Sequence, residues 1–339
     1  MTMKALSPRP AGQPLRILMS AQSAQRHAAR VQAALSGAPH RIVTLEGDGT
    51  DLDADVAFIS RDVTGLSTKH EVLPATQAYY DALCRCKSLA WVHTHSAGAD
   101  RSIFTVLREQ GVLVTTSAGA NAGVVTQSAL AGILALARHF PLLARAQQER
   151  RWAPLLGTGL PRDVAGQTAT IVGWGAIGQY IGQLLSCLGM RVVAVRQSVQ
   201  PSAPALETIT YAMLPDLLPR TDWLVLACPL TPVTQGLVNA AALALLPSRA
   251  CLVNVARGEV VDEQALCEAL VQGRLAGAYL DVFAHEPLAV DSPLWDMPNV
   301  IVTPHSAGFS DGNGERVVRM FLANLGRWAR SEPLHNISA

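Results

Sequence analysis

Apolar segments of strand length alternate with helical patterns along almost the whole chain, and this rhythm limits the possible folds more than any other feature. The first series of expected strands comprises Leu15–Ser20, Arg41–Leu45, Asp55–Ile59, Leu89–His93 and Val112–Thr115. A second, stricter series comprises Thr168–Val172, Arg191–Val195, Trp223–Ala227, Cys251–Val255, Ala278–Val282 and Val300–Thr303. Strands alternating with helices predict parallel sheets covered on both faces, so two series predict two doubly wound α/β domains.

Length and composition agree with this prediction. A chain of 339 residues is typical of about two domains. Hydrophobic residues make up 49% and charged residues 16%, which supports a large core and argues against disorder. The net charge is +1 without a long run of either sign, so nucleic acid and anionic membranes are not expected partners. No apolar stretch is long enough to span a bilayer.

The N-terminus and the cysteines favour a cytoplasmic protein. Residues 1–14 contain three prolines and no apolar signal core, so we expect a frayed tail there. No cysteine has partners at the spacing of a zinc site, so we expect no metal. We expect reduced, mostly buried thiols at all six positions, which are Cys84, Cys86, Cys187, Cys228, Cys251 and Cys267.

Between the two series lies Ala122–Phe140, a segment of helical pattern that is apolar on nearly every side. Such a helix must be buried, and its small residues, among them Ala129 and Gly132, permit close packing. It could be a core helix of one subunit or a helix shared between two subunits. Nineteen residues of apolar helix exceed what one side of a surface needs, so we predict a homodimer.

A glycine-rich turn follows the expected strand Thr168–Val172. It reads Gly173-Trp174-Gly175-Ala176-Ile177-Gly178, and a helical pattern follows that leads to a second strand at Arg191. This strand–turn–helix–strand context is the one that a dinucleotide fingerprint requires. Gly173 permits the tight turn, Gly175 lets the backbone approach a pyrophosphate, and Gly178 lets helix and strand pack closely. The free N–H groups of Ala176 and Ile177 at the helix N-terminus then face the phosphates.

The end of the second cofactor strand indicates which nicotinamide nucleotide is used. NAD sites usually have an acidic residue there, which accepts from the ribose hydroxyls. This chain instead reads Val195-Arg196-Gln197-Ser198. Arg196 can pair with a 2′-phosphate and Ser198 can donate a hydrogen bond to it, so we predict NADP, with NAD as the alternative.

Further candidate groups follow other strands of the second series. They are Cys228 and Pro229 after the third strand, Arg257 after the fourth, Glu286 after the fifth and His305 after the sixth. Because ligands of open α/β sheets bind beyond the carboxyl ends of the strands, we expect these groups to converge. Arginine binds a carboxylate in bidentate fashion, histidine transfers a proton near neutral pH, and a carboxylate beside the histidine stabilises and orients the imidazolium. Together they predict a catalytic Arg, Glu and His.

With these motifs, the chain resembles the D-isomer-specific 2-hydroxyacid dehydrogenase family over nearly its whole length. The matching segments are the glycine turn at 172–178, the PLT-x-x-T segment at 229–234, Asn254-Val255-Ala256-Arg257-Gly258, Asp281-Val282-Phe283 with Glu286-Pro287-Leu288, and Thr303-Pro304-His305-Ser306-Ala307-Gly308. The resemblance implies a Rossmann cofactor domain at residues 118–308. That domain would be inserted in a flavodoxin-like substrate domain at residues 1–117 and 309–339.

The resemblance also implies roles for single residues. Arg257 would bind substrate, Glu286 would be the partner of the histidine, and His305 would be the general acid/base. The backbone N–H groups of Ala97 and Gly98 would hold the substrate carboxylate. The positions implied to contact the cofactor are Gly173, Gly175, Ala176, Ile177, Gly178, Arg196, Ser198, Cys228, Pro229, Thr234, Val255, Asp281 and His305.

Two departures from the family pattern are visible. A glutamate is usual where this chain reads Val125-Thr126-Gln127, and an acidic residue is usual at Arg196. The first departure bears on a local contact and the second on the cofactor. The carboxylate at Glu286 disfavours the formate dehydrogenase branch, in which a glutamine stands at that position.

We therefore predict an NADPH-dependent reductase of a small 2-keto acid of the glyoxylate or hydroxypyruvate type, which yields a D-2-hydroxy acid. Two alternatives remain. One is an NAD-linked enzyme similar to phosphoglycerate dehydrogenase, and the other is a non-catalytic nicotinamide-binding sensor or co-regulator, which the fold alone does not exclude.

Overall fold

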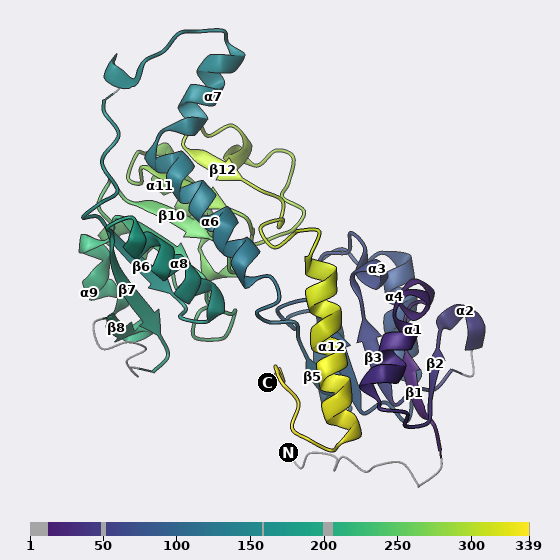
Figure 1. The fold of residues 1–339 in the computed structure, drawn as a ribbon. Coiled ribbons are helices and arrows are strands. Elements are labelled where there is room, and N and C mark those ends of the chain that lie inside the picture. The colour runs from purple at the N-terminus through teal and green to yellow at the C-terminus, as the bar shows by residue number, and fades with distance from the viewer. Residues whose placement is uncertain (1–12, 49–51, 158, 199–205, 339) are drawn as a thin grey trace. The chain divides into compact units, whose positions relative to one another are not determined.

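The structure is a computed structural model that describes residues 13–48, 52–157, 159–198 and 206–338. The chain forms two compact units, one built from residues up to Asn121 together with those from Ser310 onward, and one from Ala122–Phe309 (Figure 1). The sequence placed the boundaries at 117/118 and 308/309. Most of the expected N-terminal tail lies outside the described residues.

The first unit contains a five-stranded parallel sheet. Its strands are β1 (Leu15–Leu18), β2 (His40–Val43), β3 (Val56–Ile59), β4 (Trp91–Thr94) and β5 (Leu113–Thr115), in the order β2-β1-β3-β4-β5. This is the flavodoxin-like order. The helices are α1 (Ala21–Ala34), α2 (Leu45–Asp48), α3 (Arg61–Thr64), α4 (Pro74–Arg85), α5 (Ser102–Glu109) and α12 (Asn313–Ala329). An aromatic cluster joins the sheet to α12, with the Phe58 and Phe321 rings stacked at 4.5 Å.

The second unit contains a seven-stranded parallel sheet in the order β12-β11-β10-β9-β6-β7-β8. Its strands are β6 (Thr168–Val172), β7 (Arg191–Arg196), β8 (Glu207–Thr210), β9 (Trp223–Leu226), β10 (Cys251–Asn254), β11 (Gly277–Leu280) and β12 (Val300–Val302). The helices are α6 (Ala122–Ala137), α7 (Phe140–Gln148), α8 (Ala176–Cys187), α9 (Leu214–Leu217), α10 (Ala240–Leu245) and α11 (Glu263–Val271), and the 3-10 turns are η2 (Leu155–Gly157), η3 (Tyr211–Met213), η4 (Leu218–Arg220), η5 (Gly258–Val260) and η6 (Pro293–Trp295). The strand order reverses between β6 and β9, as in a Rossmann sheet. The predicted fold class, two doubly wound parallel-sheet domains, is confirmed.

The prediction of one helix over Ala122–Phe140 was wrong at its C-terminal end. α6 ends at Ala137, and α7 begins at Phe140 after a bend of 73°. Pro141 lacks an N–H and its ring would clash with the carbonyl four residues earlier, so α6 cannot continue through it. His139 occupies the left-handed region at the bend, with φ of 57°.

Two other expectations need correction. β8 was missed, because it is a short edge strand in which only Ile209 is buried and the apolar pattern is therefore almost absent. The cysteines were expected to be mostly buried, but only Cys86, Cys228 and Cys251 are; the three remaining thiols, that of Cys187 among them, have access to solvent. Single cysteines scattered along a sequence form no pattern from which their exposure to solvent could be predicted.

Within the described part of the chain, no single helix has the length and apolar character needed to cross a membrane. α6 and α7 reach that length and composition only when they are taken together across their bend.

Candidate active site

The glycine turn lies between β6 and α8, where the strand order of the second sheet reverses. Gly173 has φ of +98°, and a Cβ there would lie 2.5 Å from the backbone nitrogen of Cys228. A Cβ on Gly178 would lie 2.0 Å from the carbonyl oxygen of Gly173, so the helix packs on the turn only without one. At Gly175 a Cβ would meet nothing within 4 Å. The turn therefore leaves open space in front of the N-terminus of α8, which suits a phosphate group.

Arg196 is the last residue of β7, and Ser198 follows in an exposed bend. β7 pairs with β6 in parallel, so both residues leave the sheet at the same edge as the glycine turn. Arg196 also influences Tyr211: burial raises the pKa of that phenol, and the nearby guanidinium opposes the rise.

Cys228, Pro229 and Thr234 form a turn after β9. The Thr234 hydroxyl donates to the Pro229 carbonyl at 2.7 Å and accepts from the Thr231 N–H at 2.8 Å, so this buried side chain holds the turn in shape. Burial raises the pKa of the Cys228 thiol to about 11, which keeps it protonated near neutral pH. The turn is therefore a rigid wall next to Gly173.

Arg257 lies in the loop that follows β10. The side chain of Asn254, the last residue of β10, bonds to this loop through both its nitrogen and its oxygen. The Asn254 amide donates to the Arg257 carbonyl at 3.0 Å, and its oxygen accepts from the Ala256 N–H at 3.0 Å. Gly258 follows, and a Cβ on it would lie 1.8 Å from the carbonyl carbon of Phe283. Only glycine lets the arginine loop approach the glutamate loop this closely.

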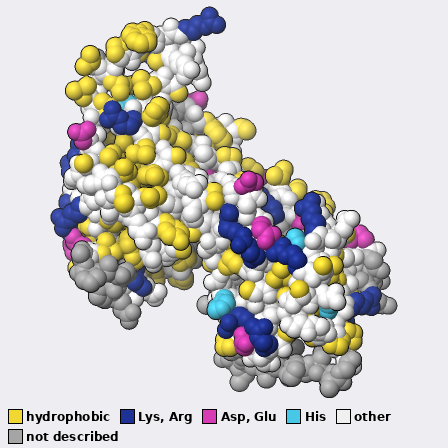
Figure 2. Space-filling view, viewed as in Figure 1, with side chains coloured by type: hydrophobic (Ala, Val, Ile, Leu, Met, Phe, Trp, Pro, Cys, Tyr) yellow, Lys and Arg dark blue, Asp and Glu magenta, His cyan; other side chains and the backbone are white. Residues whose placement is uncertain are grey.

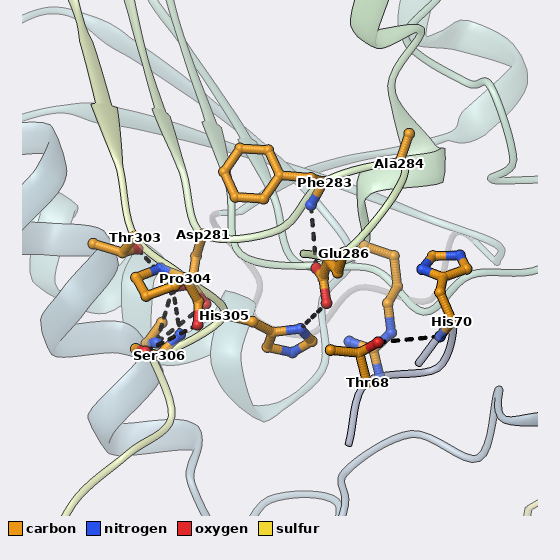
Figure 3. A network of polar contacts seen from close by, with 12 residues as sticks. Thr68, His70, Asp281, Phe283, Ala284, Glu286, Thr303, Pro304, His305 and Ser306 are labelled. Carbon is orange, nitrogen blue, oxygen red and sulfur yellow. Dashed lines mark hydrogen bonds and ion pairs between the residues drawn. The ribbon is translucent and has the colours of Figure 1, made fainter. Parts of the chain in front are cut away.

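Glu286 and His305 meet at the carboxyl ends of β11 and β12. The Nδ1 atom of His305 lies 2.8 Å from Oε2 of Glu286, while Oε1 accepts from the Phe283 N–H at 3.2 Å (Figure 3). The Glu286 side chain is only 12% exposed, whereas that of His305 is 50% exposed. The carboxylate is thus fixed inside the loop, and the imidazole keeps its other nitrogen, Nε2, for a reaction partner.

Asp281 organises the loop that carries His305. Its carboxylate accepts from the Thr303 hydroxyl at 2.6 Å and from the N–H groups of Ser306 and Ala307 at 2.8 and 3.0 Å (Figure 3). Burial raises the pKa of Asp281, and these bonds oppose the rise. The Asp281 carbonyl also accepts from the His305 N–H at 2.8 Å, which helps to hold His305 at its left-handed φ of 49°.

In the first unit, Ala97 and Gly98 lie in the loop after β4. The Ser96 hydroxyl donates to the Gly98 carbonyl at 2.7 Å, which turns the loop back on itself. Among the described residues, no carbonyl accepts from the N–H of Ala97 or of Gly98. These two donors are the kind of group that binds a carboxylate.

His93 and His95 do not form a pair. His93 is buried between the Thr115 and Ser117 hydroxyls, whereas Nε2 of His95 lies 2.8 Å from the Thr64 hydroxyl. Burial lowers the pKa of each to about 3, and for His95 the nearby Arg61 and Arg101 add to the effect. Both rings are therefore neutral near pH 7. In the described ranges no group of His, Cys, Asp and Glu side chains could hold a metal ion.

The amino-terminal edge of the second sheet differs from this edge. A cavity of about 390 Å³ lies there, lined by Leu136, Leu142, Trp223, Arg249 and neighbouring residues. It contains none of the predicted catalytic or cofactor residues. The residues that reasoning from sequence missed are Asn254, Gly258 and Thr303, which hold the loops of the site in place. The sequence could have indicated these residues, because all three lie within motifs that were assigned to other residues.

Comparison with known proteins agrees with this geometry. Residues 130–307 match the family described as D-isomer specific 2-hydroxyacid dehydrogenase, NAD binding domain. A D-3-phosphoglycerate dehydrogenase of Mycobacterium tuberculosis is 36% identical over 258 residues, which are 76% of this chain and 47% of the relative. This chain thus spans about half the length of that relative.

Several solved structures cover almost the whole chain. A D-isomer specific 2-hydroxyacid dehydrogenase from Xanthobacter autotrophicus, in complex with NADPH and MES, is 31% identical with a TM-score of 0.74 and covers 97% of this chain and 98% of its own. An NADPH-dependent glyoxylate/hydroxypyruvate reductase from Sinorhizobium meliloti, in complex with NADP and sulfate, is 28% identical with a TM-score of 0.74 and covers 96% and 98%. The family match spans more than half of the chain, and the chain belongs to the D-isomer specific 2-hydroxyacid dehydrogenase family.

Proposed function

We propose that this protein reduces a small 2-keto acid, of the glyoxylate or hydroxypyruvate type, to a D-2-hydroxy acid with NADPH. The observation that carries the proposal is the Glu286–His305 pair, 2.8 Å apart, at the sheet edge that also carries the glycine turn. A half-exposed imidazole with an enclosed carboxylate behind it is a proton donor whose orientation is fixed. The likeness to a glyoxylate/hydroxypyruvate reductase supports the substrate class.

In this proposal each catalytic side chain has one task. Nε2 of protonated His305 gives its proton to the keto oxygen as negative charge develops there. Glu286 stabilises the imidazolium and keeps the ring in position through Nδ1. The Arg257 guanidinium binds the substrate carboxylate, and the N–H groups of Ala97 and Gly98 assist it. Enclosure of the substrate would exclude water from the developing charge.

The cofactor would occupy the open space in front of α8. The N–H groups of Ala176 and Ile177 would face its pyrophosphate. Gly175 would keep the space free, while Gly173 and Gly178 allow the tight turn and the close packing of α8. When bound there, the nicotinamide would supply the hydride that the reduction requires. The other proposed contacts are Cys228, Pro229, Thr234, Val255 and Asp281, which border the same sheet edge. Asp281 would lie near the carboxamide.

NADP is the proposed nucleotide because a cation, Arg196, ends β7 where a carboxylate would repel a 2′-phosphate. Ser198, two residues on, would donate a hydrogen bond to the same phosphate. The NADPH and NADP found in the two structural relatives support this choice.

We also propose that the second unit is the cofactor domain and the first the substrate domain, in a cytoplasmic homodimer. Figure 2 shows hydrophobic side chains gathered over the face that α6 and α7 present. Phe140 is 57% and Trp152 95% exposed in the single chain, and a second copy that covered them would remove this apolar surface from water. Free cysteines fit a reducing compartment. A light-scattering mass near that of one 36.0 kDa chain at micromolar concentration would contradict the dimer.

A second candidate is an NAD-linked phosphoglycerate dehydrogenase activity, which the 36% identical relative favours. One experiment separates the candidates. Glyoxylate, hydroxypyruvate and bulkier 2-keto acids are offered with NADPH and with NADH, and 3-phosphoglycerate is offered with NAD. We expect the fastest turnover with NADPH and one of the small keto acids. Turnover of 3-phosphoglycerate with NAD would favour the second candidate, and turnover of nothing would favour a non-catalytic sensor.

A further inference from the structure

The chain passes between the two units twice, after Asn121 and after Phe309. In the first unit, one side chain of α12 bonds to the residues next to both crossings. The Arg316 guanidinium donates through Nε to the Ala120 carbonyl at 2.5 Å and through Nη2 to the Ser310 hydroxyl at 2.8 Å. Ala120 and Ser310 are 190 residues apart in sequence, and this half-buried arginine connects them.

The second unit connects the same two segments in its own way. Ser128 of α6, in the segment that enters this unit, donates through its hydroxyl to the Ala307 carbonyl at 3.1 Å. Ala307 belongs to the segment that leaves it, and its N–H donates to Asp281. His305 stands two residues before Ala307. A shift of the leaving segment would therefore reach the proposed proton donor through a short, well-bonded stretch of chain.

We infer that Arg316 is a positioning residue that makes the two crossings move as one body when the enzyme encloses its substrate. The inference rests on the proposed function, since turnover is what requires enclosure. Hinges are a few residues at loops or element ends that absorb the change in backbone angles. With both crossings tied to one guanidinium, Ala120 and Ser310 keep their distance from each other when the backbone next to them moves.

The chemistry of the side chain supports this role. A guanidinium is planar and presents its donors in a fixed fork, so it can hold two acceptors in one geometry, whereas a lysine ammonium is a single point. Gly312 leaves the space that this arrangement needs, because a Cβ on it would lie 2.7 Å from Nη1 of Arg316. Gly312 has φ of −79° and ψ of −7°, which alanine also adopts. Gly312→Ala therefore displaces the guanidinium without removing it.

The test compares Arg316→Ala, Arg316→Lys and Gly312→Ala in the full-length protein. The matched control is Arg319→Ala, because Arg319 is an exposed arginine of the same helix that forms an ion pair with Glu315 and bonds to neither crossing among the described residues. We expect turnover of the keto acid to fall about tenfold to a hundredfold in the Arg316 variants, as for misplacement by a fraction of an ångström, and by less in Gly312→Ala. Lysine should not restore it. Affinity for NADPH, measured by fluorescence, should change less than about twofold, because the proposed contacts lie in the second unit alone.

Hydrogen exchange of the NADPH-bound protein provides a second readout that does not depend on activity. Exchange at residues 118–124 and 307–313 should rise in Arg316→Ala and Gly312→Ala and not in Arg319→Ala. Unchanged turnover in Arg316→Ala and Gly312→Ala would overturn the inference. An equal loss of turnover in the control, Arg319→Ala, would overturn it as well. If Arg316→Ala does not fold, the turnover and hydrogen exchange of Gly312→Ala and Ser310→Ala decide whether the inference holds. If the wild-type protein reduces no keto acid, the proposed function fails, and exchange still shows whether Arg316 ties the crossings.

Discussion

The two edges of the seven-stranded sheet both carry charged groups, but they use them differently. At the amino-terminal edge, Asp222 accepts from Arg162 at 2.9 Å, from Arg249 at 2.8 Å and from the Thr168 N–H at 2.9 Å. Its side chain is only 8% exposed. At the carboxyl edge, the His305 ring has one carboxylate partner and remains half exposed.

The hydrogen bonds around each charged group distinguish a structural charge from one that is open to a ligand. Burial alone would raise the pKa of Asp222, but the bonds from Thr168, Arg162 and Arg249 together lower it. The Asp222 carboxylate is therefore bonded to its neighbours in the fold, and its charge stabilises the folded state. Among the described residues, the His305 ring is hydrogen-bonded at Nδ1 alone, and in the proposed mechanism Nε2 serves the substrate. The same logic predicts opposite phenotypes at the two edges.

The largest effect is expected at His305. His305→Ala should lower the rate of keto acid reduction at least about 10²-fold, because the proposed mechanism takes the proton from this ring. NADPH affinity and the urea midpoint should change little, since the ring is half exposed. Steady-state turnover, cofactor fluorescence and urea unfolding measure the three quantities. Near-normal turnover would show that His305 is not the proton donor.

The next effect concerns the nucleotide. Arg196→Ala should raise KM for NADPH about tenfold to a hundredfold and leave KM for NADH nearly unchanged, because a charge-assisted bond to the 2′-phosphate contributes about 1.5–3 kcal/mol. Added salt should partly weaken the binding of NADPH to the wild-type protein, because it screens the charge of Arg196. Arg191→Ala is the matched control, because Arg191 stands at the opposite end of β7 and pairs with Glu207. Equal use of NADH by the wild type would refute this account of Arg196.

At the amino-terminal edge the effect should fall on stability. Asp222→Asn should lower the free energy of unfolding by about 1.5–3 kcal/mol, because an uncharged oxygen accepts more weakly and the NH2 group cannot accept a bond at the second position. Turnover per folded molecule should stay normal. Since the pKa of Asp222 is lowered in the folded state, its contribution is present above the unfolded pKa of about 3.9 and is lost as the pH falls below it. Urea titrations at pH 7 and pH 3 should therefore differ less in Asp222→Asn than in the wild type.

The smallest loss of turnover is expected at Glu286. Glu286→Gln should lower the rate of keto acid reduction by a smaller factor than His305→Ala, because the amide oxygen can still hold the ring through Nδ1 although the anionic partner is lost. The rate should be measured on the chemical step, for example by single turnover with deuterated NADPH. A loss as large as that of His305→Ala would show that Glu286 does more than orient the ring.

Much of the fold and the site could be predicted because short-range patterns carry them. The run Thr168–Val172 is β6 with the same bounds, and the glycines of the following turn each meet a neighbour that excludes a Cβ or leave space for a ligand. β8 could not be predicted in this way, since an edge strand with one buried residue has no alternation to read. Pro141 indicated that α6 ends before it, but the apolar pattern continues through Phe140 and led to the prediction of one longer helix.

By itself, the sequence determined the fold class, the glycine turn and the residue types at the carboxyl ends of the strands. These follow from periodicity and from backbone angles that glycine adopts more readily than other residues, which are local properties. Only the tertiary structure decided that Asn254 fixes the loop of Arg257, that Asp281 holds the loop of His305, and that Arg316 joins Ala120 to Ser310. Hydrogen bonds between groups far apart in the chain depend on where the whole fold places them, and no local pattern records that placement.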